Sequence, residues 1–245
     1  MNALNRDARH LALPQVGVRG QQQIAAGTVL LIGAGGIGCA AATYLASSGV
    51  GNLLIADFDT VDATNLGRQI LYTAADVGAL KAEVAATRLR AINPEIEVTA
   101  INERLDDDDL ARTVAAVDVV LDGCDNFATR FQVNDACVAA NKALVTGAAI
   151  RLEGQLAVFG PDYAVSSCYR CLYTEADESL DSCAGNGVLS PVPGVIGAMM
   201  AVEALKLLAG IDTTTSRLSL YDAVQTEFRS LRVQKRKDCA TCSAM

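Results

Sequence analysis

Short apolar runs alternate with longer mixed segments along the first 150 residues of the chain. Uninterrupted apolar runs of this kind are typical of parallel strands that are buried on both faces. The runs that predict strands are 28–33, 53–57, 97–101, 118–123 and 144–149. The segments between them predict helices over 39–50, from Lys81 to Asn93, over 106–116 and over 127–141. This alternation predicts a doubly wound parallel sheet with right-handed crossovers.

The pattern changes after residue 150. An irregular stretch rich in Cys, Gly, Pro and acidic residues, 161–193, separates a predicted strand from a predicted helix and two antiparallel strands. These four elements cover 154–160, 194–210, 217–223 and 228–236. A helical arm, interrupted around Pro14 and Gly17, precedes the first strand.

We therefore expect one α/β domain over residues 1–245, with a mostly parallel Rossmann-like sheet that continues into an antiparallel half. Residues 1–150 are expected to bind a nucleotide, and residues 151–245 a second substrate.

The composition is that of a globular protein, with 51% hydrophobic and 20% charged residues. The net charge of -8 argues against nucleic acid as a partner, because phosphate binding draws on clustered Lys and Arg. Residues 20–56 carry no charge, but glycines divide them into pieces too short to cross a bilayer. Since the N-terminus also lacks the apolar core of a signal peptide, we expect a cytoplasmic protein with no membrane partner.

A glycine motif lies between the first predicted strand and the helix after it. Gly33, Gly35 and Gly38 spell G-x-G-x-x-G, and Asp57 ends the next strand. Such a turn brings backbone N–H groups close to a phosphate, and an acid at the second strand end accepts hydrogen bonds from ribose hydroxyls. The motif predicts an adenine nucleotide site without separating ATP from a dinucleotide. The alternative is a glycine turn that only packs helix on sheet.

Charged residues near the predicted strand ends and helix starts favour a triphosphate. Arg68 and Lys81 can neutralise phosphates, and Asp125 can hold Mg²⁺, with Arg130 close by in the sequence. Each of them alone is better explained as a solvated charge. A hydride-transfer enzyme usually needs a histidine near its substrate, and the one histidine of this chain, His10, lies in the N-terminal arm.

Four of the eight cysteines form two C-x-x-C pairs, Cys168 with Cys171 and Cys239 with Cys242. Two such pairs supply four thiolates for tetrahedral zinc, although free thiols or a redox pair have the same spacing. Cys39, Cys124 and Cys137 lie in apolar surroundings and are interpreted as core residues.

Several strings together resemble the ThiF/MoeB/HesA family, the bacterial relatives of ubiquitin-activating enzymes. They are GAGGIG, DFDTVDATNLGRQ, GALK, DGCDN, CYRCLY and CAGNGVLSPVPGVIG, and the resemblance runs from about Arg6 to Cys242. It implies an adenylyltransferase that uses Mg-ATP to join AMP to the C-terminal glycine of a ubiquitin-like sulfur carrier protein ending in Gly-Gly, releasing pyrophosphate. The carrier would be MoaD- or ThiS-like, for molybdopterin or thiazole biosynthesis. A separate protein would donate the sulfur.

The resemblance also implies roles for individual residues. Asp57 would bind the ribose, Asn65 would join Arg68 and Lys81 on the phosphates, and Asp125 would hold magnesium beside Asn126. The residues that it places around the nucleotide are Gly33, Gly35, Gly36, Gly38, Asp57, Asp59, Asn65, Arg68, Lys81, Asp125 and Asn126. The four paired cysteines would hold a structural zinc ion.

Two further residues are assigned by the same resemblance. Arg9 would reach into the site of a partner subunit, which implies a homodimer. Cys183 corresponds to a cysteine that becomes covalently linked to the carrier in thiazole-pathway members, while molybdopterin-pathway members adenylate without it; the alternative is a spare thiol.

Two other interpretations of the nucleotide site stay open, an NAD-dependent oxidoreductase and a nucleotide-sensing scaffold without turnover. A basic strip near the C-terminus either steers an acidic carrier protein or protects an exposed edge strand with charge. Its residues are Arg229, Arg232, Lys235, Arg236 and Lys237. The acidic run from Asp106 to Asp109 is interpreted as a solvated helix start.

Overall fold

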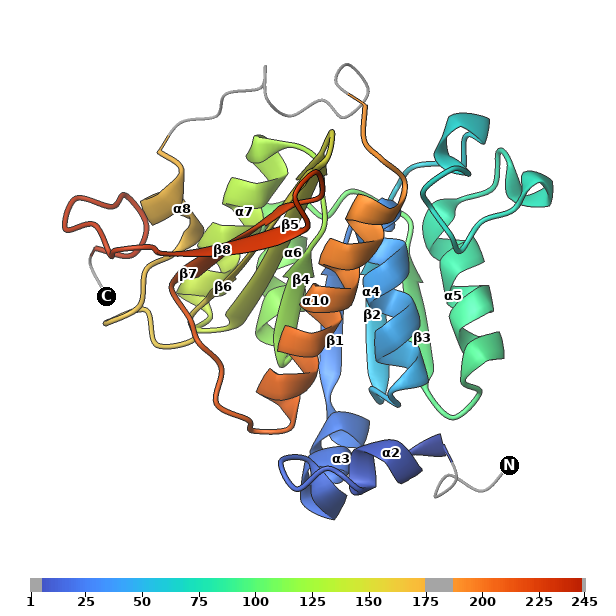
Figure 1. Cartoon of the computed structure of the whole chain (residues 1–245), viewed down its shortest axis with the longest axis horizontal. Coiled ribbons are helices and arrows are strands. Elements are labelled where there is room, and N and C mark those ends of the chain that lie inside the picture. The colour runs from blue at the N-terminus through green and yellow to red at the C-terminus, as the bar shows by residue number, and fades with distance from the viewer. Residues whose placement is uncertain (1–5, 175–186, 244–245) are drawn as a thin grey trace.

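One sheet runs through the computed structural model, which describes residues 6–174 and 187–243 (Figure 1). Its strands lie in the order β3-β2-β1-β4-β5-β6-β7-β8; the first five are parallel, and β6 to β8 are antiparallel to their neighbours. The strands are β1 Thr28–Ile32, β2 Asn52–Ala56, β3 Glu97–Ile101, β4 Val119–Asp122, β5 Ala143–Ile150, β6 Glu153–Phe159, β7 Arg217–Asp222 and β8 Glu227–Arg232. The predicted parallel sheet with an antiparallel continuation is confirmed.

Helices cover both faces of the parallel strands. Helices α4, α5 and α10 lie on one face, in front in Figure 1, and α6 and α7 lie behind the sheet. The helices are α2 Ala8–Leu11, α3 Gly17–Ala26, α4 Gly36–Ser47, α5 Lys81–Ile92, α6 Asp107–Ala115, α7 Phe127–Ala139, α8 Tyr169–Leu172 and α10 Pro191–Leu208, with 3-10 turns η1 Ala63–Asn65 and η2 Ala74–Asp76.

The parallel strands are continuous apolar runs in the sequence because the side chains of each strand pack into two cores, one on each face of the sheet. In β1, Val29 and Leu31 pack into the core under α4 and α10, whereas Leu30 and Ile32 pack into the core under α6 and α7. Successive side chains of a strand point to opposite faces, so a strand covered on both sides needs no polar alternation.

Two helices begin earlier than the apolar pattern predicts. Helix α4 starts at Gly36, inside the glycine motif, and α10 starts at Pro191. A proline suits the first turn of a helix because its missing N–H would have no partner there. The predicted irregular stretch holds α8, and Asp106 accepts a hydrogen bond from the Asp109 N–H at the start of α6, as expected for a helix cap.

Helix α10 is long and apolar enough, by length and composition alone, to cross a membrane. Its apolar composition is instead explained by its contacts inside the protein, because the helix packs along α4 and over β5 and β6. A Cβ atom on Gly197 would stand 2.2 Å from the Ile37 carbonyl oxygen, so glycine is required where the two helices touch. Helix α10 is therefore packed as a core helix of the sheet layer.

Candidate active site and metal centre

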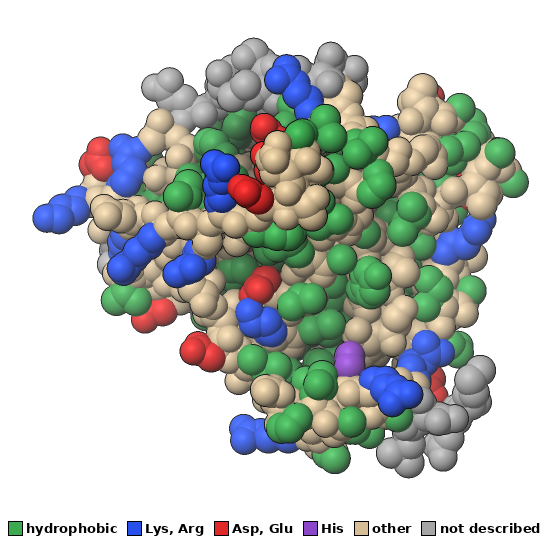
Figure 2. Space-filling model, viewed as in Figure 1, with side chains coloured by type: hydrophobic (Ala, Val, Ile, Leu, Met, Phe, Trp, Pro, Cys, Tyr) green, Lys and Arg blue, Asp and Glu red, His purple; other side chains and the backbone are tan. Residues whose placement is uncertain are grey.

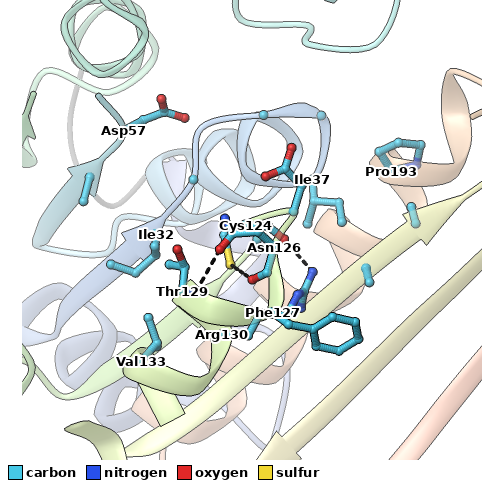
Figure 3. Close-up of a pocket in the computed structure, with 18 of the residues that line it drawn as sticks. Ile32, Ile37, Asp57, Cys124, Asn126, Phe127, Thr129, Arg130, Val133 and Pro193 are labelled. Carbon is cyan, nitrogen blue, oxygen red and sulfur yellow. Dashed lines mark hydrogen bonds between the residues drawn. The ribbon is translucent and has the colours of Figure 1, made fainter. Parts of the chain in front are cut away.

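A cavity of about 440 Å³ opens at the carboxyl ends of β1, β2 and β4 (Figure 3). The chain leaves β1 toward β2 on one side and reaches β4 on the other, so the strand order reverses between β1 and β4. Open α/β sheets bind ligands at such a switch point. The fold thus places the cavity where the glycine motif and the loop after β4 meet.

The glycine motif forms the cavity wall between β1 and α4. Gly33 has a φ of +86°, and Gly35 and Gly36 line the cavity. Gly38 does not line it; a Cβ atom there would stand 2.0 Å from the Gly33 carbonyl oxygen, so this glycine lets the helix approach the strand. No side chain caps the start of α4, which leaves its N–H groups and the positive end of the helix dipole for an anion.

Asp57 lies in the wall just beyond β2. Its Oδ2 accepts a hydrogen bond from the Ala34 N–H at 2.7 Å, and its Oδ1 accepts one from the Asp59 N–H at 2.9 Å. Burial raises the pKa of this carboxyl, against the opposing effects of Lys81 and of these hydrogen bonds. Asp57 therefore lines the cavity and ties the glycine turn to the next loop.

Two cations lie in the same wall. Lys81, the first residue of α5, is buried, and its Nζ stands 2.9 Å from Asp59 Oδ2. Arg68 is half-buried, and its Nη1 donates to the Thr64 carbonyl oxygen at 3.2 Å. Asp59, Arg68 and Lys81 all line the cavity, so the structure brings these predicted residues together.

The loop after β4 carries Asp125 and Asn126, which are exposed and line the cavity. Asn126 caps α7 by accepting the Thr129 N–H at 2.8 Å. Buried Arg130 supports the loop, because its guanidinium donates to the carbonyl oxygen of Cys124 (Figure 3). The same guanidinium donates to the carbonyl oxygen of Gly147 in β5. Mg²⁺ in nucleotide sites keeps several waters and is held by one or two carboxylates together with substrate phosphates, so the exposed carboxylate of Asp125 could hold it.

Two predicted residues are placed differently from expectation. Asn65 does not line the cavity, and its Oδ1 accepts the Asp62 N–H at 3.2 Å in a capping box at η1. Cys124 was expected in the core, but it is half-buried in the cavity wall because it belongs to the loop after β4. Cys39 and Cys137 are fully buried, as predicted. Cys183 lies outside the described residues.

Arg9 is exposed on α2, at the end of α4 opposite the cavity. The arm is anchored there by two hydrogen bonds: Gln21 Nε2 donates to the Ser48 carbonyl oxygen at 3.0 Å, and Gln21 Oε1 lies 2.9 Å from His10 Nδ1. Figure 1 shows α2 and α3 together beyond the end of the sheet. Arg9 therefore belongs to no part of the cavity of its own chain.

Sequence reasoning missed several cavity residues. Gln69 is buried in the wall beside Arg68, and its place inside the recognised string NLGRQ was the available signal. An apolar part of the wall is formed by Ile32, Ala56, Leu110 and Val133. The opposite end of the cavity is lined from the antiparallel half by Glu153, Gly154, Gln155, Tyr173 and Leu220. One cavity thus spans both halves of the sheet.

The four paired cysteines form a second candidate site. All four are buried, and their Sγ atoms lie within 4.8 Å of one another. The Sγ atoms of Cys168 and Cys239 are 3.6 Å apart, and those of Cys171 and Cys242 are 3.5 Å apart. A tetrahedral zinc ion with Zn–S bonds of about 2.3 Å requires sulfur separations of roughly this size. The donor set therefore fits zinc, and it joins α8 to the C-terminal segment.

Known proteins resemble the chain over nearly its whole length. A model of the ThiF family matches residues 8–242. The sulfur carrier protein ThiS adenylyltransferase of Escherichia coli is 44% identical over 97% of this chain and 94% of its own. The molybdopterin-synthase adenylyltransferase of the same organism is 46% identical over 91% and 90%.

A crystal structure of E. coli MccB with succinimide has a TM-score of 0.86 at 25% identity and covers 99% of this chain and 74% of that one. The structure of MccB with ATP has a TM-score of 0.80 at 26% identity, covering 92% and 69%. With its fold, its glycine-lined cavity and these matches taken together, the chain belongs to the ThiF family.

Proposed function

We propose that this protein uses ATP to adenylate the C-terminal glycine of a small ubiquitin-like sulfur carrier protein, releasing pyrophosphate. The observation that carries the proposal is the single cavity that joins a glycine turn, Arg68, Lys81 and Asp125 at one end to the antiparallel strands at the other. The relatives at 44% and 46% identity are adenylyltransferases by name, which supports the same reaction class. The carrier is MoaD-like or ThiS-like, and the pathway leads to molybdopterin or to the thiazole of thiamine.

The chemistry suits a site without histidine. The attacking group is a carboxylate that is ionised at neutral pH, so no general base is needed. The barrier lies in bringing this anion to a triphosphate and in stabilising the departing pyrophosphate, and both depend on position and positive charge. Arg68, Lys81 and the N-terminus of α4 supply that charge.

Asp125 is the residue that would hold Mg²⁺, which when bound neutralises phosphate charge. Arg130 donates to the carbonyl oxygen of Cys124, beside Asp125, and to that of Gly147 in β5, so it ties the loop that carries Asp125 to the neighbouring strand. Ile32, Ala56, Leu110 and Val133 offer an apolar surface for the adenine ring. The ribose then lies toward Asp57.

The carrier tail would enter from the antiparallel half. Gly154 and Gln155, at the start of β6, line the cavity, and Tyr173 donates a hydrogen bond to Gln155 Oε1 at 3.0 Å. The edge strand β8 is exposed along its length, and Figure 2 shows Lys and Arg side chains gathered on that side of the molecule.

The basic strip divides into two parts, which bear on how a carrier would dock. Arg229 and Arg232 are exposed on β8 and suit electrostatic steering of an acidic partner. Lys235 instead donates to the carbonyl oxygens of Tyr163 and Ala164, and Arg236 pairs with Asp238 at 2.9 Å. The Lys235 contacts fasten the C-terminal segment to the loop that leads to the cysteine cluster, and the Arg236–Asp238 pair lies within that segment.

The cysteine cluster is proposed to hold a structural zinc ion, with four ligands and no open position for a reactant. Sulfur would come from a separate donor protein. Cys183 either forms a covalent link to the carrier or is a spare thiol, and adenylation is expected to proceed without it. The cellular location that we propose is the cytoplasm.

The proposed assembly is a homodimer in which Arg9 enters the cavity of the partner subunit. Its support is the position of Arg9, exposed on an arm that lies at the far end of α4 from the cavity of its own chain. An arginine so placed serves nucleotide chemistry only if it belongs to another copy.

The decisive experiment is isotope exchange between pyrophosphate and ATP, with a panel of added carriers that end in Gly-Gly. Carrier-dependent exchange is the expected result, and the carrier that supports it identifies the pathway. Hydride transfer to NAD without exchange would favour the oxidoreductase interpretation. Nucleotide binding without either reaction would favour a scaffold.

A further inference from the structure

Gln69 is a buried polar residue of the cavity wall, with 4% of its surface exposed. Its backbone is fully engaged: its N–H donates to the Asn65 carbonyl oxygen at 2.9 Å, and its carbonyl oxygen accepts the Tyr72 N–H at 3.1 Å. The backbone of this cavity-lining residue is therefore already paired, and any hydrogen bond to a ligand in the cavity is left to its side-chain amide.

The Oε1 atom of Gln69 has no hydrogen-bond partner among the residues that the structure describes. Two other buried side-chain atoms in the described ranges share this state, on Asn102 and Ser167, and neither residue lines the cavity. A buried amide oxygen without a donor destabilises a folded protein, so such a group calls for a reason. Its position in a ligand cavity supplies one.

The amide lies at the anion-binding end of the cavity. Its Nε2 is 3.8 Å from the place where a Cβ atom on Gly35 would stand, and Gly35 is the N-cap of α4. The neighbouring residue packs on the same turn, because a Cβ atom on Gly36 would lie 3.2 Å from the Arg68 carbonyl oxygen. A helix N-terminus with an unpartnered buried amide beside it points to a ligand that offers both acceptors and donors.

We propose that Gln69 is a nucleotide-binding residue that recognises the hydrated magnesium complex of the triphosphate. The amide N–H donates to a phosphate oxygen, and Oε1 accepts a hydrogen bond from water that the metal ion carries. At the helix N-terminus, where the phosphates are proposed to lie, the metal-bound water supplies the donor and the phosphate the acceptor, so Gln69 contributes to binding of the triphosphate and not of the nucleoside. The inference rests on the proposed use of Mg-ATP.

The test is calorimetric binding of a non-hydrolysable ATP analogue with Mg²⁺, and of adenosine, to the full chain, together with thermal unfolding of the ligand-free protein. In Gln69→Met the side chain keeps its size and loses the orphaned acceptor. We expect affinity for the analogue to fall about tenfold or more, because the lost contacts are hydrogen bonds to charged groups. Adenosine affinity stays unchanged, and the ligand-free variant unfolds at the same or a higher temperature.

Asn93→Leu is the matched control. Asn93 is a buried carboxamide at the far end of α5, and its amide is already paired: Nδ2 donates to the Ala46 carbonyl oxygen at 2.9 Å and Oδ1 accepts the Glu95 N–H at 3.2 Å. This variant should unfold at a lower temperature and bind the analogue as the unaltered protein does. Gln69→Met is thus expected to lower analogue affinity without lowering stability, and Asn93→Leu to lower stability without lowering analogue affinity.

Gln69→Glu keeps the shape of the side chain and places a carboxylate beside the phosphates, so it should weaken analogue binding further while sparing adenosine. It decides the matter if Gln69→Met fails to fold. Unchanged analogue affinity in the folded variants, or an equal loss for adenosine, would overturn the inference. A failure of the unaltered protein to bind the analogue would instead overturn the proposed function and this inference with it.

Discussion

Lys81 and Asp59 form an ion pair whose two members differ sharply in exposure. The Lys81 side chain is 8% exposed and the Asp59 side chain 57% exposed, with 2.9 Å between Nζ and Oδ2. A lysine at the start of a helix and inside a cavity needs an anion nearby, and Asp59 is that anion in the nucleotide-free protein. The pair therefore holds the ammonium group in the cavity before any phosphate arrives.

Asp59→Asn is expected to destabilise the nucleotide-free protein more than Lys81→Met does. The first change leaves a buried cation without its partner, whereas the second leaves a carboxylate that water already reaches. The difference in the free energy of unfolding should be about 1 to 2 kcal/mol, because solvent screens the exposed side of the pair. Urea unfolding at neutral pH measures it, and the reverse order of stabilities would contradict this account.

Arg68→Ala and Asp125→Ala are each expected to reduce carrier-dependent pyrophosphate exchange by about 100-fold or more while leaving the fold intact. Both side chains line the cavity and neither is fully buried. Arg112→Ala, a change of an exposed arginine on α6, is the control and should exchange normally. Full activity in both cavity variants would remove the roles proposed for them.

Cys168→Ser is expected to lower the zinc content and the unfolding temperature by more than it lowers the intrinsic rate of adenylation. The cluster is buried and joins α8 to the C-terminal segment, and none of its cysteines lines the cavity, so a metal ion bound there would stabilise the fold without contacting the nucleotide. Metal analysis and thermal unfolding measure the effect. Cys124→Ser, which changes a cysteine outside the cluster, should keep the metal. A fully stable protein without bound metal would refute the assignment.

Asp76 is expected to stabilise the loop before α5 in a pH-dependent way. Hydrogen bonds from the Thr73 hydroxyl and N–H, with a further contribution from Arg88, hold the pKa of the Asp76 carboxyl below its ordinary value. A lowered pKa in the folded state stabilises the protein above the ordinary pKa of the group, and this stabilisation is lost as the pH falls through the folded-state value. Asp76→Asn should therefore be less stable than the unaltered protein at neutral pH, and unfolding curves should converge in acid. A difference that persists unchanged in acid would contradict this.

Mixing Arg9→Ala with Asp125→Ala is expected to restore activity that neither variant has alone. In a mixed dimer, one cavity keeps its own Asp125 and receives Arg9 from the partner. Random exchange of subunits should recover up to about a quarter of the unaltered activity, since half of the dimers are mixed and each holds one intact site. Size-exclusion chromatography checks the dimer itself. No recovery from a dimeric mixture would show that Arg9 does not act across subunits.

The sequence predicted the strands well because most of them lie between two helix layers. Val29 to Ile32 are apolar without interruption, and a strand with that pattern has few alternatives in a chain of this length. The glycine motif and the clustering of Arg68 with Lys81 were also predicted correctly, since both follow from where the strands end.

The errors arose in loops, where apolar periodicity gives no information. Cys124 has apolar neighbours along the chain but sits past the end of β4, so it faces the cavity. The side-chain oxygen of Asn65 accepts a hydrogen bond in a local cap, and the spacing of residues in the sequence does not reveal such a bond. Gln69 follows a 3-10 turn and is buried where the chain packs near the start of α4, a contact that the spacing of residues does not reveal.

The change of direction at β6 also determines how far apart two reactants would lie. Strands β5 and β6 pair from Ile150 with Glu153 onward, so the two residues Arg151 and Leu152 alone connect them. Because side chains alternate along a strand, one residue added to this turn would slide β6 against β5 and exchange the faces toward which Gly154 and Gln155 point. The length of this two-residue hairpin thus sets the distance between a bound nucleotide and the peptide terminus that would react with it. No hinge between separate bodies is needed to align the two.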